Sequence, residues 1–182
     1  MENLELCKSC KGSCCKAMGC HYSPEDFTDL SFEGLKKEIE KGYISIDYWE
    51  GNPFEDNRDI RQAYYLRIKH INSNIVDASW GGVCCLLTDS GCSLTYDCRP
   101  KGGRLLIPSK DYSCIPEYTK QQSAMDWYVY NDVLEKLVNY FSSKKENIDS
   151  IIDNLFKNLS FMHESVGRDD INKIKNILNP KN

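Results

Sequence analysis

The chain has 182 residues, of which 41% are apolar, and its formal net charge at pH 7 is −4. This length suits one domain, over residues 1–182. The charge gives no support to nucleic-acid binding, which needs a basic surface, and no apolar run is long enough to cross a bilayer. Residues 1–6 are acidic and lack the apolar region of a secretory signal. We therefore expect a cytoplasmic protein with no nucleic-acid or membrane partner.

The first element in chain order is a cysteine cluster, CKSCKGSCC, at residues 7–15, and Cys20 follows it. A cytoplasmic protein keeps most thiols reduced, and a disulfide between neighbours such as Cys14 and Cys15 is strained. Thiolates held close together suit zinc or the iron of an iron–sulfur cluster. The cluster therefore predicts a metal site. Because successive side chains diverge, we expect Cys14 and Cys15 to bind different ions, or only one of them to be a ligand.

Two short helices and a pair of strands are predicted after this cluster. Ser23 can cap a helix that runs to about residue 30, and Ser31 can cap another that ends at Gly42. Residues 43–49 and 63–70 are rich in β-forming residues. They predict an antiparallel hairpin with a long connection.

A second cysteine cluster lies between residues 80 and 108, where repeated glycine and proline predict irregular chain with extended pieces near 85–87 and 104–107. Glycines beside thiols let backbone N–H groups approach sulfur, which stabilises thiolates. We expect this cluster to meet the first one at the metal, tying the N-terminal part to the middle of the chain.

A change of spacing from about residue 116 predicts a helical tail. Apolar residues recur three and four apart over 127–141, again over 148–159, and over a short third segment at 171–178. The predicted fold class is α+β and mostly helical. A cysteine-rich, irregular metal-binding part with a small β-hairpin (1–114) is covered by a C-terminal helical hairpin (115–182).

The two cysteine clusters together resemble the YkgJ-type cysteine-cluster family, whose members are described as domains that chelate zinc or iron. Cys-x2-Cys-x3-Cys-Cys at 7–15 matches the first family signature. Cys84 and Cys92, followed by Arg99-Pro100, match the second. The family pattern Arg-Pro-x-x-Cys-Arg is broken, because Gly103 stands where a cysteine is expected. The family also includes the longer flagellin lysine methylases, but nothing here resembles an S-adenosylmethionine site.

The sequence and the resemblance together give eight candidate metal ligands, and Cys98 and Cys114 are the candidates to replace the cysteine missing at position 103. Cys20 and His21 stay open as further ligands, whereas Cys85 is expected to be a small core residue. The ligand set is Cys7, Cys10, Cys14, Cys15, Cys84, Cys92, Cys98 and Cys114. Cysteine spacing alone does not choose between Zn²⁺ and an iron–sulfur cluster as the cofactor.

A small basic group next to the thiols carries a further hypothesis. Four thiolates on one zinc ion, or on a doubly positive [4Fe–4S] core, leave a net charge of about −2. Arg99 or Arg104 is expected to offset this charge.

Three functions remain open at this stage: a mainly structural metal centre, a zinc or iron–sulfur enzyme for redox or group-transfer chemistry, and a metal-handling or metal-sensing protein. The sequence indicates a metal ion as the partner and identifies no protein partner, substrate or oligomeric state.

Overall fold

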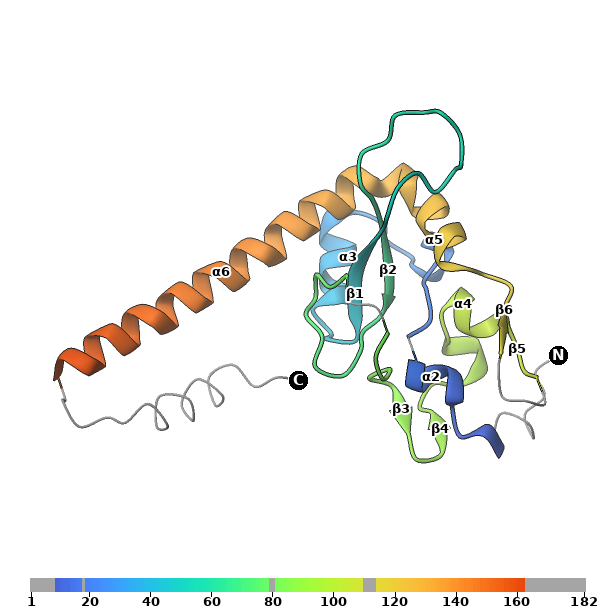
Figure 1. The fold of residues 1–182 in the computed structure, drawn as a ribbon, viewed down its shortest axis with the longest axis horizontal. Helices are drawn as coiled ribbons and strands as arrows, with labels where there is room; N and C mark the ends of the chain where they lie inside the picture. Colours follow the sequence, from blue (N-terminus) through green and yellow to red (C-terminus); the bar gives the residue numbers. More distant parts are fainter. Residues whose placement is uncertain (1–8, 18, 79–80, 110–113, 163–182) are drawn as a thin grey trace. The chain divides into compact units, whose positions relative to one another are not determined.

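The computed structural model describes residues 9–17, 19–78, 81–109 and 114–162 (Figure 1). The chain divides into two compact units, 1–138 and 139–182. Helices and small antiparallel sheets make an α+β fold, as predicted. Within the described ranges, no helix combines the length and the apolar character needed to span a membrane.

A β-hairpin forms the framework of the first unit and confirms the strands predicted from the sequence. Strand β1 (Ile44–Trp49) pairs antiparallel with β2 (Ala63–Ile68). Residues 20–22 run along the outer edge of β2, where Tyr22 N donates to Leu66 O and Ile68 N donates to Cys20 O, both at 2.9 Å. These bonds fix Cys20 beside a rigid strand.

A buried ion network ties the hairpin to the loop that follows it. Arg67 on β2 donates from Nε to Asp47 Oδ2 on β1 at 2.9 Å, and from Nη2 to Asp77 O and Oδ2 at 3.0 and 3.3 Å. The Arg67 and Asp47 side chains are only 3% and 5% exposed. Charges this deeply buried are stable only when they are paired and hydrogen-bonded, as they are here.

The helix starts at Ser23 and Ser31 are where the sequence predicts them. Helix η1 (Pro24–Asp26) has a capping box between Ser23 and Asp26, and α3 (Phe32–Ile39) is capped by Ser31 Oγ. However, η1 is a single turn rather than a helix to residue 30. The chain turns extended at Phe27, whose ring packs on Trp127 at a centroid distance of 5.6 Å. The extended backbone at Phe27 therefore ends the helix after one turn.

Helix α5 (Lys120–Trp127), which leads into η3 (Tyr128–Tyr130), packs on the hairpin (Figure 1). Trp127 is fully buried, and its Nε1 donates to Tyr22 O at 2.8 Å. Ser123 Oγ donates to the same carbonyl at 2.8 Å. The helix therefore holds the segment that follows Cys20.

The cysteine-rich region is made of very short elements, as its glycine and proline content predicts. Figure 1 shows them grouped at one end of the hairpin. They are α2 (Ser13–Ala17), β3 (Leu87–Thr88), β4 (Gly91–Cys92), η2 (Tyr96–Cys98), α4 (Lys101–Arg104), β5 (Leu106–Ile107) and β6 (Ile115–Pro116). Strands β3 and β4 form one tiny antiparallel sheet, and β5 and β6 form another.

The α4 turn was expected to be irregular, because Gly102 and Gly103 are poor helix formers. Asp26 explains its formation, since its Oδ2 accepts a hydrogen bond from Lys101 N at 2.9 Å. A carboxylate at the start of a helical turn satisfies a free backbone N–H group. A residue 75 positions away in the sequence thus stabilises α4.

The prediction of two separate tail helices over 127–141 and 148–159 is wrong. Helix α6 (Asn131–Met162) runs without a break from within the first segment through the whole of the second, and residues 127–130 belong to α5 and η3. The intervening residues 142–147 contain neither glycine nor proline, so nothing in them stops the helix. The third predicted helix, at 171–178, lies outside the described residues.

Candidate metal centre

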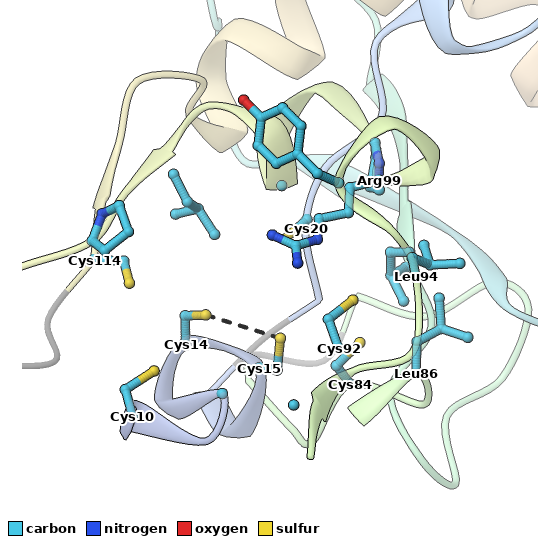
Figure 2. A pocket seen from close by; sticks show the side chains of 18 of the residues that line it. Cys10, Cys14, Cys15, Cys20, Cys84, Leu86, Cys92, Leu94, Arg99 and Cys114 are labelled. Atoms are coloured by element: carbon cyan, nitrogen blue, oxygen red, sulfur yellow. Dashed lines mark hydrogen bonds between the residues drawn. The ribbon is translucent and has the colours of Figure 1, made fainter. Parts of the chain in front are cut away.

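Seven of the nine described cysteines line one cavity of about 240 Å³, which we call the thiol cavity (Figure 2). They come from five separate stretches of chain. These cysteines are Cys10, Cys14, Cys15, Cys20, Cys84, Cys92 and Cys114. Cys7 lies outside the described residues. The structure therefore brings six of the eight predicted ligands together and adds Cys20 to them.

Backbone hydrogen bonds hold α2, with Cys14 and Cys15, against the segment around Cys84. Cys84 N donates to Cys15 O at 2.7 Å, and Gly82 N donates to Ala17 O at 2.9 Å. Gly12 has a φ of 74°, and a Cβ at this position would lie 2.5 Å from a methyl carbon of Leu87. The positive φ favours glycine at this position, and α2 lies so close to β3 that a side chain here would displace Leu87.

Cys20 and α4 form another wall of the cavity. Gly102 N donates to His21 O at 3.0 Å, which places α4 against the segment that carries Cys20. Gly103 also lines the cavity, and a Cβ at this position would lie 3.4 Å from Cys20 Sγ. The position where the family resemblance expects a cysteine therefore faces Cys20.

Cys14 and Cys15 converge rather than diverge. Their Sγ atoms are 3.9 Å apart, and both line the same cavity (Figure 2). With zinc–sulfur bonds of about 2.3 Å, two ligands of one tetrahedral zinc ion stand about 3.8 Å apart. The spacing of this pair fits two ligands of a single ion.

Hydrogen bonds among the thiols of Cys14, Cys15 and Cys84 shift their pKa values in opposite directions. The thiol of Cys15 lowers the pKa of Cys14 to about 6 and that of Cys84 to about 7. The same hydrogen bonds raise the pKa of Cys15 itself. Burial raises the pKa of Cys20 to about 12. Thiols whose pKa is lowered, such as those of Cys14 and Cys84, are suitable donors for a soft or borderline cation, which displaces their protons on binding.

The side chains do not converge on a single ion. Within the described part of the chain, no three Cys, His, Asp or Glu side chains are grouped so that they could hold one metal ion. The sulfur atoms instead surround the cavity from several sides (Figure 2). Apart from the close pair Cys14 and Cys15, the cysteines line the cavity wall at separate points.

Apolar side chains and one arginine complete the thiol cavity. Leu86, Leu94, Leu106 and Pro108 are among the lining residues. Figure 2 shows the side chain of Arg99 reaching from the wall toward the sulfur atoms. The Nε of this arginine is buried, and its guanidinium lies 5.8 Å from the ring centre of Tyr96.

Three of the residues considered from the sequence do not line the cavity. Cys98 is exposed and faces a second hollow of about 480 Å³, whose lining also includes Tyr22 and Lys37. Burial raises the pKa of Cys85 to about 11. His21 is buried beside Tyr65, and burial lowers its pKa to about 4, so it is neutral. Cys85 is half-buried, and its expected role as a small core residue stays a prediction.

The comparisons with known proteins add no identity. No protein-family model, no curated protein and no solved structure matches this chain. The resemblance to the YkgJ-type family therefore stays a prediction, and the functional argument depends on the thiol cavity alone.

Proposed function

We propose that this chain is a cysteine-cluster protein that binds a thiolate-ligated metal centre in the thiol cavity. One observation carries the proposal: seven cysteines, drawn from segments as far apart as residues 10 and 114, line a single cavity. Ordinary core packing does not gather sulfur at this density. Such a set of soft donors suits zinc or iron.

A polynuclear centre is favoured over a single zinc ion. A structural zinc ion takes four ligands, and seven described thiols line the cavity. Their lack of convergence on one point fits a centre in which different thiolates bind different metal atoms. An iron–sulfur cluster meets both conditions, because its thiolates bind different iron atoms. A pair of zinc ions meets only the condition on ligand number, since each zinc ion needs four grouped donors.

The proposed role of the metal is partly structural. The helix and strand that carry thiols of the cavity, α2 and β4, have only five and two residues, and such short elements bury little apolar surface. A metal centre bonded to Cys14, Cys84 and Cys92 would join α2, the β3–β4 hairpin and the connection between them. Metal binding in small thiolate domains commonly supplies folding free energy in this way.

The test is the metal content of the full chain purified without oxygen. We expect bound zinc, or iron together with acid-labile sulfide, at two or more metal atoms per chain. Iron would give the brown colour of thiolate-to-iron charge transfer, and zinc would leave the protein colourless. A preparation that holds neither metal, and that takes up neither on reconstitution under reducing conditions, would refute the proposal.

An enzyme is the second candidate, and the apolar wall of the cavity favours it. Pockets for small organic molecules combine mostly apolar walls with a few polar groups, and Leu86, Leu94, Leu106 and Arg99 provide this combination. A metal with only three protein ligands would support this candidate, because a catalytic metal keeps an open position. A metal fully enclosed by thiolates would exclude it.

A further inference from the structure

Arg99 differs from every other described residue that lines the thiol cavity. It is the one lining side chain with a fixed positive charge, and the only other ionisable groups there are the thiols and Tyr96. We infer that Arg99 is the counter-cation of the metal centre and that Asp26, acting through Arg104, positions it. This inference rests on the proposed function and adds to it the residue that sets the charge balance of the centre.

The net charge of the loaded centre predicts whether Arg99 strengthens or weakens metal binding. Four thiols that lose their protons to a divalent ion leave a net charge of about −2 in the cavity. Loading the centre therefore makes the cavity more negative, although the incoming ion itself is positive. A fixed positive charge then favours the loaded state, and apolar walls that exclude water strengthen this interaction.

Arginine suits this role because its guanidinium does not lose its proton in a protein. The side chain lines the cavity beside Tyr96, and its Nε is buried. Figure 2 shows the guanidinium group among the sulfur atoms. Arg99 therefore acts where the thiolate charge develops.

Arg104, the other arginine considered from the sequence, has a different position. Its Nη2 donates to Asp26 Oδ1 at 2.8 Å, and its Nη1 donates to the carbonyl oxygen of Arg99. The Asp26 side chain is 5% exposed, and its Oδ2 also accepts from Lys101 N and Ser23 N at 2.9 Å. Arg104 thus fixes the backbone of Arg99 to a buried carboxylate and is a positioning residue.

The experiment measures Zn²⁺ affinity of the full chain by competition with a chelator, under reducing conditions, with Co²⁺ absorption as an independent readout. Loss of an outer partner of a metal ligand typically costs about 10- to 100-fold in affinity, and we expect this loss for Arg99→Met. Arg99→Lys, which keeps the charge, should recover most of it. Lys101→Met is the matched control, because Lys101 pairs with Glu25 and Asp126 and does not line the cavity.

The outcomes separate the possible failures. If Arg99→Met binds Zn²⁺ as tightly as the unchanged protein, or if Arg99→Lys is as weak as Arg99→Met, the charge role is refuted. If the unchanged protein binds neither Zn²⁺ nor Co²⁺ and carries no iron, the proposed function fails instead. Should the isolated centre contain iron, Arg99→Met is expected to lower its reduction potential, because a lost cation disfavours the added electron.

The positioning role of Arg104 has its own test in a double-mutant cycle. If Arg104 acts only through Arg99, Arg104→Met should weaken Zn²⁺ binding alone but add nothing once Arg99 is already methionine. Additive losses in the double variant would show that Arg104 acts independently, which would overturn this part of the inference.

Discussion

Cys20 and Cys98 provide the sharpest contrast between the thiol cavity and the rest of the cysteine-rich region. Cys20 was left open in the sequence, whereas Cys98 was a predicted ligand. The structure places Cys20 in the cavity wall and Cys98 at the surface of another hollow. We therefore expect Cys20→Ser to impair metal binding and Cys98→Ser to leave it unchanged.

The magnitude follows from the number of ligands in a thiolate site. Structural zinc binding contributes roughly 10 to 16 kcal/mol over four ligands, so one thiolate accounts for about 3 kcal/mol, or about a hundredfold in affinity. Spare thiols in the same cavity can replace Cys20 in part. A loss of at least about tenfold is therefore expected for Cys20→Ser.

The assay is Zn²⁺ competition on both variants of the full chain, with far-ultraviolet circular dichroism of the loaded proteins to show that each is folded. Serine is similar in size to cysteine, so packing changes little in either variant. Equal losses in the two variants, or unchanged binding in Cys20→Ser, would refute the assignment of Cys20 to the centre.

Three further results are expected. Removing the metal with a chelator should lower the melting temperature by about 10 °C, since an ion at a thousandfold excess over its Kd stabilises by about 4 kcal/mol; an unchanged melting temperature would exclude a structural role. Gly102→Ala should destabilise by about 1 to 3 kcal/mol in urea unfolding, because its Cβ would lie 2.8 Å from His21 O, whereas Gly103→Ala should cost less, because its Cβ would lie 3.2 Å from its nearest contact, the Cβ of Arg99. Arg67→Met should cost about 3 to 5 kcal/mol by leaving Asp47 buried and unpaired, and the exposed Arg61→Met should cost little in the same measurement.

Local sequence signals were sufficient to predict the elements that depend on residues close to them in the sequence. The β-hairpin was predicted because β-forming residues fill 43–49 and 63–70, and the start of α3 because Ser31 can cap it. The N-terminal thiols were identified because their density has no packing explanation. Each of these signals lies within a few residues of the structure that it predicts.

The remaining features depend on contacts between distant residues, which a single sequence does not show. Helix α4 forms despite two glycines because Asp26 caps it from 75 positions away. Cys20 enters the cavity because its segment pairs with β2. Arg99 lines the same cavity, whereas Arg104 pairs with Asp26, and the sequence alone does not distinguish the two arginines.

X-ray absorption spectroscopy at the edge of the bound metal, on the full chain purified without oxygen, tests the central claim most directly. The account predicts a first shell of sulfur at about 2.3 Å, and a metal–metal scattering shell from a polynuclear centre. A first shell made mainly of nitrogen and oxygen, or a chain that carries no metal to measure, would contradict it.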